Sequence, residues 1–108
     1  MKSVIRTAAR DDILRQYRYY LIEKDAEAAA GRFTAAVHSA IAQACKHPAI
    51  GTPKALNNPE VAGLRSRSVK GFPAMRVYYL VSGDRLQVLR VLHGKRDLTR
   101  ILEVEFDI

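Results

Sequence analysis

The segment AMRVYYLVSGDRLQVLRVL, residues 74–92, contains the two strands that decide the fold. Its first part, Ala74 to Val81, is rich in aromatic and β-branched residues, which favour strands. Ser82 to Arg85 follows with the composition of a hairpin turn. Leu86 to Leu92 is apolar at all but two positions, as in a strand that is buried on both faces. The segment therefore predicts two long antiparallel strands at the centre of a sheet.

Two further strands are expected elsewhere in the chain. In Leu64 to Val69, arginine and serine alternate as they would on the two sides of a strand. Lys70 to Pro73 makes the turn into the strand that follows. Residues 48–63 hold three of the four prolines and two glycines, which is typical of a loop. Ser3 to Arg6 reads as a short strand near the start of the chain. We therefore expect four strands in all.

The segment between the first strand and the loop predicts two helices, because apolar residues recur there at spacings of three and four. The first extends from about Ala8 to Lys24, with Thr7 as its expected N-cap. The second starts after a cap at Asp25 and stops at His47-Pro48, because proline cannot continue a helix. Since only a residue or two separates them, the helices should form an antiparallel hairpin.

A short last helix, Leu98 to Glu103, is expected after a cap at Asp97. The order is then strand, helix, helix, three strands and short helix, and the helical hairpin must cover one face of the sheet. We therefore expect an α+β fold, a two-layer domain with a mostly antiparallel four-stranded sheet. One such domain accounts for the whole chain, residues 1–108.

The charge of the chain indicates an anionic partner. Lysine and arginine number 18 against 11 acidic residues, and the net charge is +7. The excess is concentrated between Leu64 and Arg100, where nine basic residues face two acids. Such a surface suits nucleic acid or an acidic protein segment, although a merely soluble basic surface is the alternative. The chain has no apolar run that could cross a membrane, and the single Cys45 fits a reducing cytoplasm.

The sequence indicates neither a metal site nor a cofactor. Cys45 and His47 lie at the end of the second expected helix and His38 lies earlier on it, but zinc requires three or four ligands at matched spacing. The glycines are scattered, and none belongs to a phosphate-binding fingerprint between a strand and a helix. We therefore expect no cofactor.

The basic residues of the sheet are candidates for phosphate chemistry. Arg65 and Arg67 are two apart on one strand, so their side chains share a face. Arginines grouped in this way can hold phosphates or stabilise charge during RNA cleavage, which also requires an acid and a base. His93 is the only good candidate near neutral pH. A lone histidine at a strand end is more often structural, however, and Arg90 could equally pair with a carboxylate such as Asp97.

The segment GFPAMRVYYLVSGDRLQVLRVLHGKRDL, Gly71 to Leu98, and the order of elements resemble the RelE/ParE superfamily of bacterial toxins, and ParE-type toxins most closely. The resemblance covers nearly the whole chain. It implies a toxin of a type II toxin–antitoxin system that inhibits DNA gyrase and is neutralised by a ParD-like antitoxin. ParE-type toxins are not known as enzymes. The alternative is the RelE branch, which shares the fold but is a ribosome-dependent endonuclease of messenger RNA.

For the RelE alternative, the resemblance implies a catalytic set drawn from Arg65, Arg67, Arg90, His93 and Arg96. That branch often carries its acid–base residue, a tyrosine or histidine, in the C-terminal segment. No tyrosine follows Tyr79 here, which favours gyrase inhibition, although His93 could replace the tyrosine.

An antitoxin surface is also expected. A domain this small leaves apolar surface around the helical hairpin, and an acidic, disordered antitoxin tail could fold onto it as an amphipathic helix. Toxin and antitoxin would then form a hetero-oligomer. A plain binding module without toxicity is a third possibility. The expected antitoxin contacts are Tyr17, Tyr20, Leu21, Arg65, Arg67 and Arg76.

Overall fold

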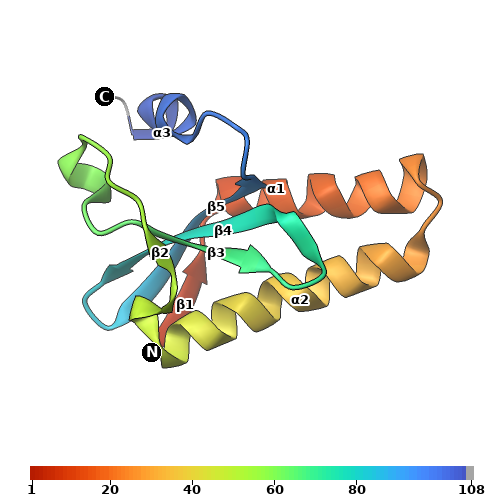
Figure 1. Cartoon of the computed structure of the whole chain (residues 1–108), viewed down its shortest axis with the longest axis horizontal. Helices are drawn as coiled ribbons and strands as arrows, with labels where there is room; N and C mark the ends of the chain where they lie inside the picture. The colour runs from red at the N-terminus through yellow and green to blue at the C-terminus, as the bar shows by residue number, and fades with distance from the viewer. Residues whose placement is uncertain (107–108) are drawn as a thin grey trace.

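A five-stranded sheet with the order β1-β5-β4-β3-β2 forms the centre of the molecule (Figure 1). The computed structural model describes residues 1–106, with side chains to residue 103. β1 pairs with β5 in parallel, and every other neighbouring pair is antiparallel. The strands are β1 (Lys2–Ile5), β2 (Thr52–Pro53), β3 (Arg65–Val69), β4 (Phe72–Ser82) and β5 (Arg85–His93).

The α+β class and the mostly antiparallel sheet are confirmed, but the expected count of four strands is too low. The additional strand is β2, which pairs with Ser66 and Arg65 at the edge of the sheet. It is only two residues long and includes Pro53, which an edge strand tolerates because one side of its backbone needs no partner. Its surroundings have the composition of a loop, and this composition hides the strand. β4 also begins earlier than expected, at Phe72.

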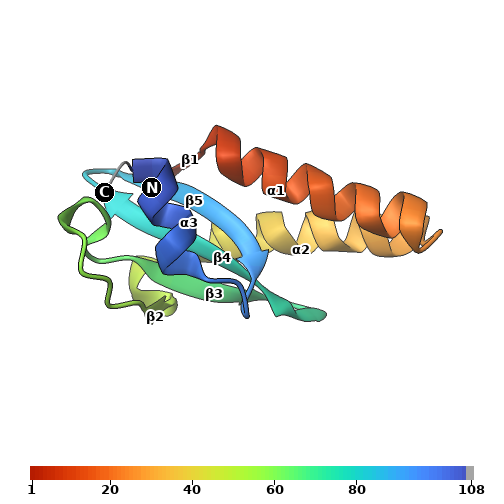
Figure 2. The same ribbon diagram turned by 90° about the horizontal axis from the view of Figure 1, so that it is seen from above.

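The helical hairpin covers one face of the sheet (Figures 1 and 2). It consists of α1 (Thr7–Arg18), a π-helical turn at Tyr19–Glu23 and α2 (Glu27–Lys46). The predicted stop before Pro48 is confirmed. Both predicted N-caps are wrong, because Thr7 is already helical and Ala26 precedes α2. Asp25 instead takes a left-handed conformation, with φ of 46°, where the chain reverses between the helices.

The core beneath the hairpin is apolar and tightly packed. Phe33, Val37 and Ile41 of α2 belong to one buried cluster with alternate residues of β4, including Val77 and Tyr79. The Tyr79 hydroxyl donates to the carbonyl oxygen of Pro48 at 2.7 Å and accepts from the backbone N–H of Gly51 at 2.8 Å. This pair of hydrogen bonds fastens the start of the loop to the sheet.

The opposite face of the sheet carries a second, smaller core beneath α3 (Leu98–Phe106). The intervening residues of β4, Tyr78 and Leu80, point to this side because side chains alternate along a strand. Leu102 of α3 is fully buried here. The predicted cap is confirmed, since the Asp97 carboxylate accepts from the Arg100 N–H at 3.2 Å. The helix is longer than expected, since it extends to Phe106. It partly covers the face of the sheet opposite the helical hairpin, which a two-layer fold would leave exposed to solvent.

In the part of the chain that the structure describes, no helix is both long enough and apolar enough to cross a bilayer.

Candidate functional site

The end of β5 is organised by a carboxylate from α1. β1 ends at Ile5, opposite Val88, and α1 takes over its position beside β5. There the Asp12 side chain accepts from Arg90 Nε at 2.7 Å and Nη2 at 2.8 Å. It also accepts from the backbone N–H of Val91 at 2.9 Å. The buried carboxylate therefore replaces a strand partner and fixes Arg90 through a bidentate pair.

Beyond this pair, β5 leaves the sheet through a tight turn. The Gly94 N–H donates to the Ala74 carbonyl at 2.7 Å, and the Arg96 N–H donates to the His93 carbonyl at 3.0 Å. His93 Nδ1 accepts from the Lys95 N–H at 3.2 Å. The His93 ring is thus engaged in the turn by one of its two nitrogens.

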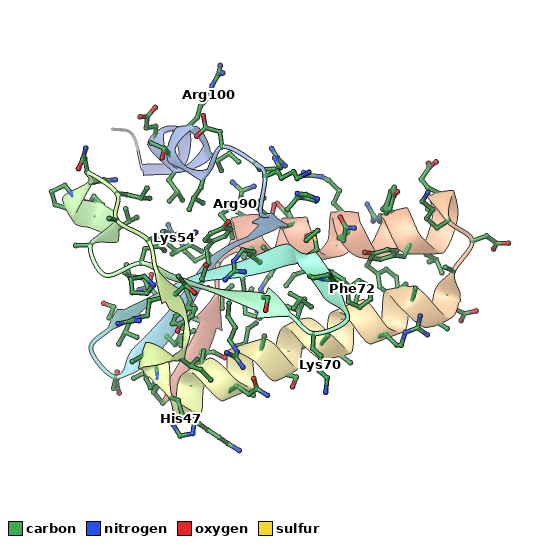
Figure 3. All side chains as sticks on the ribbon, in the orientation of Figure 1. His47, Lys54, Lys70, Phe72, Arg90 and Arg100 are labelled. Atoms are coloured by element: carbon green, nitrogen blue, oxygen red, sulfur yellow. The ribbon has the colours of Figure 1, made fainter. Side chains whose placement is uncertain are left out.

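Two hollows meet at this turn. The larger, about 490 Å³, lies between β5 and α3 and is lined by Arg90, Arg96, Asp97, Arg100 and Ile101. Figure 3 labels Arg90 and Arg100, which come from the two elements that border it. The smaller, about 90 Å³, faces α1 and includes Arg15, His93 and Arg96 in its lining. Arg96 lines both hollows, so the basic side chains form one continuous cluster around the end of β5.

The other two nuclease candidates lie elsewhere. Arg65 donates to the carbonyl oxygens of Ala49 at 3.2 Å and Gly51 at 2.8 Å. Arg67 Nη2 donates to Gln43 Oε1 of α2 at 2.6 Å. Arg67 on β3 lies opposite Val77 on β4, which in turn lies opposite Val91 on β5, and both valines are buried. The structure therefore gathers Arg90, His93 and Arg96 and keeps Arg65 and Arg67 apart from them.

The candidate antitoxin contacts are also spread over several places. Tyr17 lines an apolar groove of about 350 Å³ between α1 and α2. Tyr20 is half-buried, with its ring centroid 5.7 Å from that of Phe33 and 5.3 Å from that of Phe72. Leu21 is half-buried in the π-helical turn. Arg76 points toward the α3 side, where its Nε donates to Ser66 Oγ at 3.0 Å.

Two exposed apolar side chains enlarge the surface of the hairpin. Leu14, which also lines the groove, is 46% exposed, and Ile22 is 68% exposed. The apolar periodicity of the first helix includes Leu14, but it does not reveal which of these apolar side chains remain exposed to solvent. Exposure depends on the angle at which α2 packs against α1, and only the structure supplies it.

The structure clearly changes the pKa of Tyr78. Burial beneath α3 raises the pKa of its phenol, and the nearby Arg76 partly opposes this by lowering it. Tyr78 is 3% exposed, so the ring packs in the second core and leaves no face on which a base could stack.

No metal centre is apparent in the described part of the chain, where no three histidine, cysteine or acidic side chains converge.

Comparisons with known proteins place this fold in a family. A family model, the ParE toxin of the type II toxin–antitoxin system parDE, matches residues 4–98. A comparison with curated proteins gave no match. Among solved structures, the chain is similar to one from the chromosomal ParDE toxin–antitoxin system of P. aeruginosa. The identity is 16% and the TM-score 0.66, over 86% of this chain and 95% of that one.

The chain is also similar to the YoeB/ParE toxin from Agrobacterium tumefaciens, with 24% identity and a TM-score of 0.56. That match covers 87% of this chain and 99% of the other. Identities this low support the shared fold, and the family model supports the membership. The resemblance seen in the Gly71 to Leu98 segment is confirmed, and the chain belongs to the ParE toxin family of type II toxin–antitoxin systems.

Proposed function

We propose that this chain inhibits DNA gyrase in the cytoplasm and is held inactive by a ParD-like antitoxin. The match to the ParE toxin family over residues 4–98 carries the proposal, because resemblance to ParE-type toxins implies gyrase as the target. Inhibition of this kind requires a binding surface, and it requires no catalytic group in the toxin itself.

The arrangement of the basic residues weighs against the nuclease alternative. Arg65 and Arg67 are engaged with backbone carbonyls and with Gln43, where they support the packing of α2 and the loop. Arg90 is committed to Asp12. His93 and Arg96 are then the remaining candidates, and of these two only the His93 side chain is of a type that commonly acts as a general acid or base. Cleavage of RNA requires both an acid and a base within reach of the phosphate.

The apolar groove of the hairpin supports the antitoxin part of the proposal. Leu14 and Tyr17 present apolar surface beside Arg10, a combination that suits an amphipathic helix with acidic residues along its border. We propose that Tyr17 and Leu21 contact the antitoxin directly and that Tyr20 supports them from within the aromatic cluster. Arg65, Arg67 and Arg76 are proposed to attract the acidic tail, which would make association faster at low salt.

The test uses the purified chain with gyrase and, separately, with translating ribosomes. We expect gyrase-linked breaks in supercoiled DNA, intact messenger RNA, and loss of the effect when the antitoxin is added. Cleaved messenger RNA that disappears in the His93→Ala variant would instead support the nuclease. Neither effect, together with tight antitoxin binding, would support the plain binding module.

A further inference from the structure

We propose that the tip of the helical hairpin contacts gyrase, an assignment that rests on the proposed function. The contact surface consists of Tyr19 and Ile22 and is called the hairpin-tip patch below. Its border is formed by the charged side chains of residues 18–27. The hairpin projects beyond the sheet, and the patch lies at the projecting end (Figures 1 and 2). A projecting end of this kind can enter a recess on a much larger protein.

The patch exposes two large side chains to solvent. Ile22 is 68% exposed, the highest value for a large apolar side chain in the part of the chain described to residue 103, and Tyr19 is 41% exposed. Both belong to the π-helical turn Tyr19–Glu23, in which no residue is fully buried. Single π-helical turns are rare and often mark functional sites. Single exposed apolar residues are common on protein surfaces, however, so exposure alone does not make a site.

The exposed ring of Tyr19 is held in place by its neighbours. Its centroid lies 5.6 Å from that of Tyr20 in an edge-to-face arrangement, and the Lys24 ammonium lies 5.6 Å from the Tyr19 centroid. Tyr20 in turn packs against Phe33 and Phe72, so the core supports the exposed ring. A side chain that is already ordered loses little conformational entropy on binding, which suits it to anchor an interface.

The backbone of the tip is also fixed. The Lys24 N–H donates to the Tyr19 carbonyl oxygen at 3.2 Å, and the Ala26 N–H donates to the Tyr20 carbonyl oxygen at 2.9 Å. Asp25, between these two donors, has the left-handed conformation that reverses the chain. The two hydrogen bonds close this reversal around the π-helical turn, so the patch is presented on a defined framework before any partner arrives.

The charge around the patch favours a protein over a nucleic acid or an anionic membrane. Residues 18–27 carry two basic and three acidic side chains, all exposed, and their net charge is −1. The whole chain has a net charge of +7, so the tip differs in sign from the molecule as a whole. Phosphate groups of a nucleic acid or a lipid surface would be repelled there. A tyrosine and an isoleucine within a rim of mixed charge instead have the composition of a protein–protein contact.

The same charge separates the patch from the antitoxin groove. The groove is lined by Arg10 and apolar side chains of α1 as far as Tyr17, and it includes neither residue of the patch. An acidic antitoxin tail is attracted to Arg10 and repelled by the acidic tip, which leaves the patch to the second partner, gyrase. Leu21, the proposed antitoxin contact, is adjacent to Ile22 in the chain. A bound antitoxin would therefore stand beside the patch and obstruct a protein as large as gyrase.

The test compares Ile22→Ser with Ile50→Ser in an assay of gyrase-linked breaks in supercoiled DNA. Ile50 is 41% exposed and follows α2 at the end away from the tip, so it is a matched control (Figure 1). We expect Ile22→Ser to require at least about ten-fold more protein for the half-maximal effect, because it removes a central anchor of the interface. Ile50→Ser should behave as wild type. Full potency of Ile22→Ser beside an active wild type would overturn the assignment of the patch alone, whereas an inactive wild type would overturn the proposed function and the assignment with it.

Calorimetric titration with the cognate antitoxin distinguishes the patch from the groove. Ile22→Ser should bind the antitoxin as wild type does, which would also show that the variant is folded. Tyr19→Ala is a second variant of the patch, and its effect on gyrase should fall in the same direction while its antitoxin affinity is kept. A loss of antitoxin affinity as large as the loss of gyrase inhibition, in both variants, would assign the patch to the antitoxin and overturn the proposal.

Discussion

The carboxylate of Asp12 and the guanidinium of Arg90 are joined by two hydrogen bonds of 2.7 and 2.8 Å, although 78 residues separate them in the chain. The same carboxylate accepts from the Val91 N–H, so one side chain serves an arginine and a strand edge together. Because the Asp12 side chain is 2% exposed and that of Arg90 15%, the pair is largely shielded from water. The end of β5 and the start of the hairpin are thus fixed to each other.

Replacing Asp12 with alanine should therefore destabilise the protein strongly. Removing one partner of a buried pair costs about 3–5 kcal/mol, since the other charge is left buried, and the Val91 N–H also loses its acceptor. Urea unfolding followed by circular dichroism measures the change. Asp11→Ala is the matched control on the same helix, where the carboxylate is exposed, and its effect should stay within about 0.5 kcal/mol. Similar losses in the two variants would show that the Arg90 pair contributes little.

Gly51→Ala should destabilise the loop that follows α2. A Cβ at this position would lie 2.5 Å from the Tyr79 hydroxyl oxygen and 2.9 Å from the Ser66 carbonyl oxygen. Overpacking of this kind costs about 1–3 kcal/mol. Gly31→Ala is the comparison, because it lies in α2 with no atom within 4 Å of the added Cβ. There we expect a gain of up to about 1 kcal/mol from helix propensity. The two midpoints in urea should move in opposite directions, and a shared direction would contradict the packing argument.

Tyr78 should make stability sensitive to alkaline pH. Its folded-state pKa is raised above the ordinary value of 10.0, chiefly by burial, so the folded state favours the protonated phenol. The associated stability is fully present below the unfolded pKa, near pH 10, and is lost as pH rises through the folded pKa. Urea unfolding of wild type and Tyr78→Phe across this range isolates the effect, because other titrating groups are common to both. Parallel stability curves for the two proteins would exclude a contribution from the phenol.

Leu14→Lys should weaken antitoxin binding. Leu14 is 46% exposed and lines the apolar groove, so its replacement leaves the core intact but places a charge where an apolar face would dock. A loss of at least about ten-fold in affinity is expected for a residue near the centre of an interface. Calorimetric titration with the antitoxin provides the measurement. Val81→Lys is the control, since Val81 is 41% exposed on β4 outside the groove lining, and it should bind as wild type does. Equal affinities for both variants would place the antitoxin elsewhere.

Much of the fold follows from local signals. The β4–β5 hairpin is marked by strand-forming residues on either side of Gly83, whose φ of 61° the tight turn requires. The end of α2 is marked by Pro48, and the start of α3 by Asp97. These features depend on residues that are close in sequence, so the sequence carries them directly.

The partners of the arginines depend on distant contacts and could not be read in the same way. Asp97 is near Arg90 in the sequence, but it is engaged at the start of α3, and Asp12 is the partner instead. Arg65 and Arg67 share a face, as the spacing of two indicates. Their acceptors come from the end of α2 and the loop, and the position of those segments is set by tertiary packing. The sequence could therefore suggest candidate residues, but it could not show which of them the structure brings together.

The pairing of β1 with β5 has a consequence for synthesis on the ribosome. Lys2 lies opposite Arg85, and Ile5 lies opposite Val88, so β1 cannot pair with β5 until residues 85–88 have been made. Contacts of such long sequence separation form late, because the loop between them must close first. A nascent chain that stops before β5 leaves the hairpin without its sheet and Asp12 without Arg90. Translation must therefore pass β5 before this domain acquires its native fold.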